Sequence, residues 1–127
     1  MFGHGSKETD QINIWAKAYP HVVSQALELP FSEQLDLIAN LDIMLSMDSA
    51  NGHLAANFNV PVVTLWGMTH PFLGFSPFGQ NNHLLVDRES FPKIPTSAYG
   101  KMTPKGYKDA MRTISPEEVI EMLLDKT

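Results

Sequence analysis

The chain has 127 residues, a net charge of −5 and 43% hydrophobic residues, which is the composition of one ordinary globular domain. A disordered or fibrous protein is excluded, because the apolar content is too high and neither glycine nor heptad periodicity is present. The absence of cysteine excludes disulfides, thiolate metal sites and a cysteine nucleophile. Apolar runs reach only about five residues, whereas a membrane-spanning helix needs roughly 20.

Two predicted helices occupy the first third of the chain. The apolar spacing indicates a helix over residues 7–18, with Ser6 as its cap. A short strand is predicted over residues 21–24. Ser32 is then expected to cap a second helix, whose inward-facing residues are Leu35, Ile38 and Ala39.

Three apolar strands follow. Residues 41–47 are almost continuously apolar, as expected for a strand covered on both faces. A short helix is predicted at 51–58, and further strands at 61–66 and 83–86. The last helix has the clearest start, because it opens with a cap, a proline at the first helical position and a capping box in Ser115-Pro116-Glu117-Glu118. Strands that alternate with helices predict an α/β fold around a parallel sheet.

The segment 88–114 fits no regular element, and it carries most of the positive charge. Residues 1–87 hold eight acidic and two basic residues, whereas residues 88–112 hold six basic and two acidic ones. Irregular segments of this length are uncommon in compact domains and are often functional. We expect it to cross to another domain, to cover an anionic ligand or membrane surface, or to be a solvated or disordered loop. Nucleic acid is not an expected partner, because the cations are few and do not lie on a helix beside aromatics.

The most informative segment joins the strand at 41–47 to the helix after it. The strand ends at Asp48 and the helix carries His53, with four small residues between them: Ser49, Ala50, Asn51 and Gly52. Ligands of parallel α/β sheets bind beyond the carboxyl ends of the strands, and a helix N-terminus at that edge favours a phosphate. His53 can donate a hydrogen bond to the same group, and Asp48 can bond hydroxyls or order the turn. The structural alternative makes Asp48 or Ser49 a simple N-cap and His53 a satisfied core histidine.

Two further loops are predicted at the same edge of the sheet. Gly67 and Thr69 follow the strand at 61–66 and would line the same crevice, although an ordinary turn explains them as well. The glycine-rich stretch at 2–8 is neither a GxGxxG motif nor a P-loop. Its Glu8 can accept hydrogen bonds from a ribose or a base, or merely interact with the helix dipole. Neither a metal site nor a hydrolase triad is expected, because HExxH, a close ligand pair and GxSxG are all missing.

At these residues the sequence resembles glycosyltransferase family 9, the lipopolysaccharide heptosyltransferases. The resemblance covers roughly residues 2–80, in three motifs that occur in the family's order: Phe2–Glu8, Asp48–Ala55, and Val60–Val63 followed by Trp66-Gly67, Thr69 and Pro71. It departs from the family at Ala50, where glycine is common, at Gly52, where a larger residue is usual, and at His70. The resemblance implies that 1–127 is the C-terminal, donor-binding half of a GT-B enzyme, with a Rossmann-like three-layer fold. Phe2-Gly3 resembles the end of a strand whose start is missing, which also predicts a fragment.

The resemblance implies how the site works. Residues 49–53 would hold the diphosphate of a nucleotide-sugar donor, expected to be ADP-heptose, through backbone N–H groups and the His53 side chain. Asp48 would bind the donor sugar or orient its motif, Glu8 would lie near the adenosine, and Thr69 would lie on the facing loop. The family's proposed catalytic base belongs to the N-terminal half, so no catalytic residue is assigned here. The chain alone is expected to be inactive, and no cofactor or metal is expected.

The implied parent enzyme would transfer the sugar to a lipopolysaccharide-type acceptor bound by its N-terminal half. The implied location is the cytoplasm, with peripheral association of the parent at the inner face of the inner membrane. Three other interpretations stay open. Asp48 could be the phosphoacceptor of a receiver-like signalling module, although the lysine and the acidic pair of such modules are missing. The others are a GT-B-fold sugar-nucleotide epimerase and a structural module without a ligand.

Overall fold

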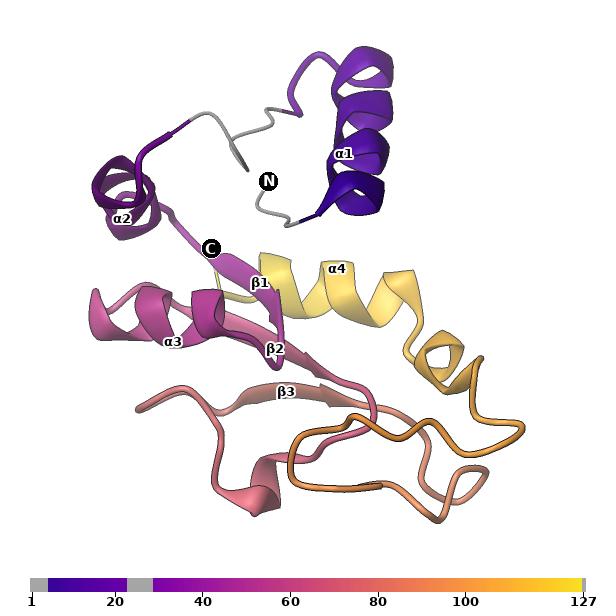
Figure 1. Ribbon diagram of the computed structural model, residues 1–127. Coiled ribbons are helices and arrows are strands. Elements are labelled where there is room, and N and C mark those ends of the chain that lie inside the picture. Colours follow the sequence, from indigo (N-terminus) through magenta and orange to yellow (C-terminus); the bar gives the residue numbers. More distant parts are fainter. Residues whose placement is uncertain (1–4, 23–28, 127) are drawn as a thin grey trace. The chain divides into compact units, whose positions relative to one another are not determined.

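The computed structural model describes residues 5–22 and 29–126, and the chain divides into two compact units, 1–37 and 38–127 (Figure 1). The first unit contains helix α1 (Ser6–Ala18) and most of α2 (Phe31–Ala39), which ends just beyond it. Both helices lie where the apolar spacing predicts them. Of the strand predicted at 21–24, the described residues 21–22 form no strand, and 23–24 lie outside the described residues.

The predicted caps of these two helices are wrong. Gly5 is the N-cap of α1, with φ 94°, so Ser6 is the first helical residue and caps nothing. The Thr9 hydroxyl donates to the carbonyl of Gly5 at 3.0 Å. In α2 the helix begins one residue before Ser32, so Ser32 is a helical residue and not the cap. The Gln34 side chain donates to the carbonyl of Leu29 at 2.8 Å, which ties the chain before the helix to its first turn. Spacing alone does not fix the residue at which a helix begins.

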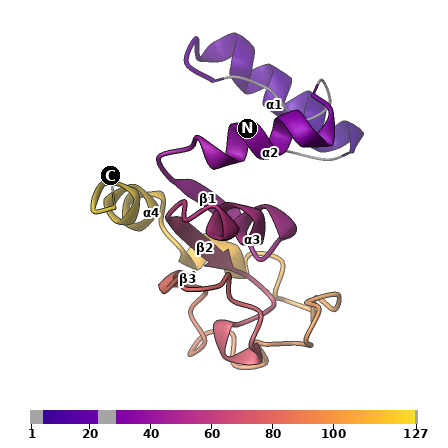
Figure 2. The ribbon, with the colours of Figure 1, turned by 90° about the vertical axis from the view of Figure 1, so that its left-hand side faces the viewer.

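The second unit is an α/β fold with a parallel sheet, as predicted. Strands β1 (Met44–Met47), β2 (Val62–Trp66) and β3 (Asn82–Leu85) lie in the order β1-β2-β3, and both neighbouring pairs are parallel. Helix α3 (Ala50–Asn57) connects β1 to β2, and α4 (Pro116–Leu124) closes the chain with the predicted Ser115 capping box. Figure 2 shows α3 and α4 on opposite sides of the sheet. This arrangement is consistent with a Rossmann-like half of a GT-B protein.

Small residues let α3 lie close to the sheet. Gly52, Ala55 and Ala56 are the buried residues of the helix. A Cβ at Gly52 would lie 3.1 Å from the Ser46 hydroxyl oxygen and 3.4 Å from a ring carbon of Pro77, which is tighter than ordinary packing. This side of the sheet therefore holds the N-terminus of α3 directly against the end of β1.

The irregular segment at 88–114 is ordered and contributes to a buried apolar cluster of the second unit. Val86, Ile94, Ala110 and Ile114 form a buried cluster, and Leu65, Met68, Leu84 and Val119 are among the partly buried residues packed against it. The apolar residues of the segment have no period of their own because each is placed by the sheet that it covers. The expectation of a disordered loop is therefore wrong for this segment, whereas its six basic residues are all exposed to solvent, as a solvated basic loop predicts.

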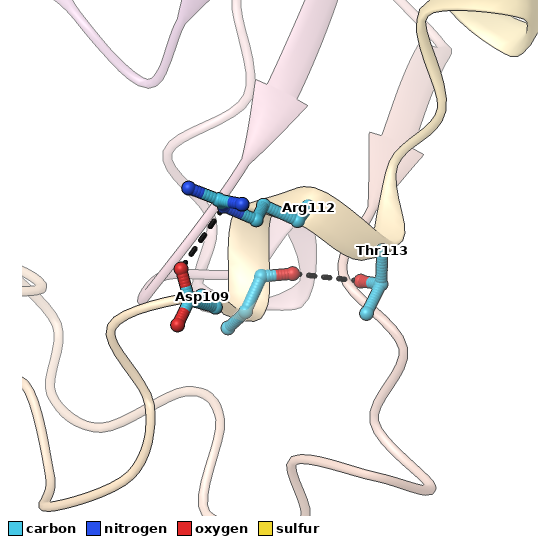
Figure 3. A network of polar contacts seen from close by, with 4 residues as sticks. Asp109, Arg112 and Thr113 are labelled. Atoms are coloured by element: carbon cyan, nitrogen blue, oxygen red, sulfur yellow. Dashed lines mark hydrogen bonds and ion pairs between the residues drawn. The ribbon is translucent and has the colours of Figure 1, made fainter.

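The short 3₁₀ helix η2 (Ala110–Thr113) fixes the end of this segment to the sheet (Figure 3). The Thr113 hydroxyl donates to the carbonyl of Ala110 at 2.7 Å and accepts from the backbone N–H of Asp87 at 2.8 Å. Asp87 follows β3 by two residues, so Thr113 links the end of the irregular segment to the chain just after β3. The ion pair of Arg112 with Asp109, at 3.0 Å, is largely exposed and contributes little.

Strand β1 is not covered on both faces, contrary to prediction. Its burial alternates, with Met44 and Ser46 buried, and Leu45 and Met47 43% and 48% exposed. The strand is also shorter than predicted, since it starts at Met44. It lies at the edge of the sheet, and the buried cluster of the irregular segment gathers over β2 and β3 instead. Among the described residues, no helix is long and apolar enough to cross a membrane.

Candidate functional site

Two adjoining hollows lie at the carboxyl ends of β1 and β2, within the second unit. The first has a volume of about 250 Å³ and the second of about 290 Å³. The first is lined by Met47, Asp48, Leu65, Gly67, Met68, Thr69, Tyr99, Gly100 and Met111. The second is lined by Asp48, Ser49, Ala50, His53, Phe75, Ala98 and Tyr99. Asp48 and Tyr99 belong to both, so the two hollows form one continuous candidate site.

The turn from β1 into α3 leaves the helix N-terminus without a side-chain cap. Ser49 has the N-cap position and an extended backbone, with φ −150° and ψ 165°, but its side chain makes no capping bond. Its hydroxyl lies 3.0 Å from that of Ser46, which donates to the carbonyl of Met47 at 2.7 Å. The first backbone N–H groups of α3 are therefore open to an acceptor from outside the helix. This geometry argues against the alternative in which Ser49 is a simple cap.

Gly67 and Thr69 line the same hollow as Asp48, because β1 and β2 are parallel neighbours and end at the same edge. A Cβ at Gly67 would lie 2.9 Å from the Met111 sulfur, so the glycine makes room for the residue that closes this wall. Thr69 is buried, at 7% exposure, and its methyl group is close to Gly100. The loop after β2 is thus shaped from outside by the irregular segment.

The remaining predicted site residues lie elsewhere. Asn51 and Gly52 line neither hollow, and Gly52 is buried against Ser46. That packing explains why this chain has glycine there rather than a larger residue. Glu8 lies in α1 of the first unit, and its place near the adenosine stays a prediction. His70 lines neither hollow, because its Nδ1 accepts from the backbone N–H of Phe72 at 3.2 Å and caps the 3₁₀ helix η1 (Pro71–Leu73).

Sequence reasoning missed the wall of the site that residues 96–100 form, here called the covering segment. Its backbone is fixed to the loop after β2, because the backbone N–H of Thr96 donates to the carbonyl of Met68 at 3.0 Å. Ala98, Tyr99 and Gly100 then line the hollows. The only signal in the sequence was the general expectation that a basic, irregular segment covers a ligand.

The charge of the site is unusual for a pocket that would hold an anion. Asp48 supplies a carboxylate and His53 an imidazole, and neither lysine nor arginine occurs among the lining residues. No cluster of three or more potential metal ligands occurs in the described ranges 5–22 and 29–126. Hydrogen-bond donors of the lining residues therefore include the backbone of α3 and the His53, Thr69 and Tyr99 side chains.

Comparison with models of protein families gives a match. The family model described as glycosyltransferase family 9 (heptosyltransferase) matches residues 5–102. The match includes the lining residues of both hollows from Met47 to Gly100. It therefore extends beyond the resemblance noted over residues 2–80. Comparisons with curated proteins and with solved structures found no match. The match supports a glycosyltransferase rather than a receiver-like signalling module. Since it covers well over half of the chain, this protein belongs to glycosyltransferase family 9.

Proposed function

We propose that this chain binds the nucleotide-diphosphate-sugar donor of a glycosyltransferase, with ADP-heptose as the expected donor. The observation that carries the proposal is the uncapped N-terminus of α3 at the floor of a hollow that also contains His53. Backbone N–H groups and the helix dipole attract a phosphate at such a position. Membership of family 9 supplies the reaction class, since it supports glycosyl transfer.

The two hollows suit different parts of such a donor. The second holds the diphosphate, because Ser49, Ala50 and His53 present their donors there. The first has walls of methionine and leucine, which suit a nucleoside. Asp48 lies between them and accepts hydrogen bonds from sugar hydroxyls, since its carboxylate would repel a phosphate. Each volume lies below the roughly 300–1,000 Å³ of ligand sites, so the donor needs both hollows.

The chemical role of the site is to stabilise the departing nucleoside diphosphate. Negative charge develops on that group as the glycosidic bond breaks, and preorganised N–H donors oppose it at no reorganisation cost. We propose that a lipopolysaccharide-type acceptor and the catalytic base are supplied by another part of the parent enzyme. On this proposal the chain alone binds donor without turnover, and the parent acts in the cytoplasm at the inner face of the inner membrane.

A nucleotide titration tests the proposal. The chain is titrated with ADP, UDP, GDP and an ADP-sugar while amide NMR shifts are recorded. We expect saturable shifts centred on residues 48–53 and 67–70. His53→Ala should weaken the shifts with every bound nucleotide, and Asp48→Ala should weaken those with the ADP-sugar. Asp42→Ala, an exposed acid of the same unit that lines neither hollow, is the matched control and should bind as the wild type does. A folded wild-type chain that shows no saturable shift with any of these nucleotides would overturn the proposal.

A further inference from the structure

We propose that Tyr99 and Lys101 form a clamp over the donor, in which the Tyr99 ring packs on the nucleoside and the Lys101 ammonium faces the diphosphate. The inference rests on the proposed function, because it assumes a nucleoside diphosphate in the hollows. It adds two binding residues from a segment in which the sequence had suggested no particular residue.

Tyr99 is placed where a ligand would touch it. It lines both hollows, yet 76% of the residue is exposed to solvent. Within the described part of the chain its hydroxyl makes no hydrogen bond, so the ring is not held at the surface by its polar end. A large aromatic side chain at the rim of a hollow gains buried area when a planar or apolar group enters below it.

The position of Tyr99 is set by the backbone on either side of it. Thr96 is bonded to the carbonyl of Met68 at 3.0 Å, three residues before the tyrosine. Gly100, directly after it, has φ 59° and passes so close to Thr69 that a Cβ would lie 2.9 Å from the threonine methyl. These two contacts fix the ends of the covering segment against the loop after β2. The backbone that carries the tyrosine is thus preorganised, which lowers the entropic cost of placing its ring over a ligand.

Lys101 supplies the charge that the lining of the hollows lacks. Asp48 is a lining carboxylate, and neither lysine nor arginine lines either hollow. The Nζ atom of Lys101 lies 5.6 Å from the centroid of the Tyr99 ring, which places the ammonium at the same rim. Two other cations of the segment are engaged elsewhere, since Arg88 donates to the carbonyl of Ile94 and Arg112 pairs with Asp109. An exposed cation–π contact is weak, so the ammonium can turn toward a bound anion.

Affinity measurements on the full chain test the clamp with adenosine, AMP and ADP as probes. Tyr99→Ala should weaken the binding of all three by about fivefold to tenfold or more, because each shares the nucleoside. Tyr99→Phe should bind within about twofold of wild type, since stacking does not need the hydroxyl. Lys101→Gln should weaken ADP binding by about twofold to fivefold and leave adenosine binding unchanged, and added salt should shrink the difference. Lys105→Gln, an exposed lysine of the same segment, is the matched control.

The outcomes separate the clamp from the proposed function. If wild-type chain binds ADP and His53→Ala weakens it, while Tyr99→Ala and Lys101→Gln bind as wild type, the clamp is wrong and the donor site stands. If Lys101→Gln weakens adenosine as much as ADP, the assigned contact with the diphosphate is wrong. If the folded wild-type chain binds no nucleotide, both proposals are overturned together.

Discussion

The indole Nε1 of Trp66 donates a hydrogen bond to Nδ1 of His83 at 3.2 Å, and the two rings meet edge to face. Trp66 ends β2 and is only 1% exposed, so its N–H group has no access to solvent. The bond requires the neutral imidazole, in which Nδ1 is an acceptor and Nε2 carries the proton. Protonation of His83 would set two N–H groups against each other.

We predict from this pair that the protein loses stability as the pH falls below about 6.5. Burial lowers the pKa of His83, so the folded state binds fewer protons than the unfolded state between the two pKa values. Stability is therefore fully present above the unfolded pKa and declines as the pH falls toward the folded one. Urea unfolding at pH 7.5 and 5.5 measures the difference.

His70 has to be separated from His83 in that experiment. Burial lowers the pKa of His70 too, and Arg88 and His83 add to the effect by charge repulsion. We expect His83→Gln and His70→Gln each to flatten part of the pH dependence. Equal slopes in wild type and in both variants would show that neither imidazole is responsible. His83→Leu should cost about 1–3 kcal/mol at pH 7.5, because the buried indole N–H then lacks an acceptor.

Gly100→Ala should destabilise the protein more than Gly79→Ala does. Both glycines have positive φ, 59° and 69°, so each substitution adds the left-handed backbone cost of about 1–2 kcal/mol. Only at Gly100 would the new Cβ meet neighbours, the Thr69 methyl at 2.9 Å and Met68 Cβ at 3.4 Å. Paired denaturation curves measure the difference. A Gly79→Ala cost equal to that of Gly100→Ala would argue against the close approach of the covering segment.

Gly52→Ala should also lower stability, because its methyl group would lie 3.1 Å from the Ser46 hydroxyl oxygen. The helix propensity of alanine, about 1 kcal/mol better than that of glycine, works in the opposite direction. The same substitution made together with Ser46→Gly should therefore be much less costly than the sum of the two single changes. Thermal unfolding of wild type, the two single variants and the double variant measures how far the two changes in stability depart from a simple sum. Additive changes would contradict the close approach of Gly52 and Ser46.

Ser115→Ala should cost about 0.5–2 kcal/mol, because it removes the cap of α4. The hydroxyl accepts from the backbone N–H of Glu118 at 3.1 Å, and the Glu118 carboxylate accepts in return from the backbone N–H of Ser115 at 2.9 Å. Bonds from the backbone and the hydroxyl of Ser115 lower the pKa of Glu118. The contribution of Glu118 to the free energy of unfolding is thus present above the usual glutamate pKa, and it is lost as the pH falls through the lowered pKa of the folded state.

The pH dependence of unfolding in the acid range checks this capping box. Wild type should lose stability more steeply than Ser115→Ala between about pH 5 and 3, where the unfolded glutamate takes up a proton. Ser6→Ala serves as the control, because Ser6 is an exposed serine outside α4 that caps no helix. Glu118→Gln removes the titrating acceptor of both Ser115 bonds and should flatten the acid slope further. An acid slope in Glu118→Gln identical to that of wild type would contradict the reciprocal bond.

The amino-acid sequence alone determined the features that depend on neighbours a few residues apart. The cap and proline at Ser115-Pro116 marked the start of α4, and the alternation of apolar runs with amphipathic helices indicated a parallel α/β sheet. The same alternation of strands and helices predicted that Asp48 and Gly67 lie together, because parallel strands have their carboxyl ends at one edge of the sheet. The local motifs also indicated the family that the match to residues 5–102 shows.

Only the tertiary structure decided what encloses the site and which faces are buried. Thr96 and Met68 are 28 residues apart, yet their bond carries Tyr99 over the hollows. No spacing in the sequence encodes such a contact, because it depends on how the irregular segment fills the face of β2 and β3. Leu45 is exposed for the same reason: hydrophobicity states a tendency to be buried, and the position of a strand in its sheet decides whether a partner is there.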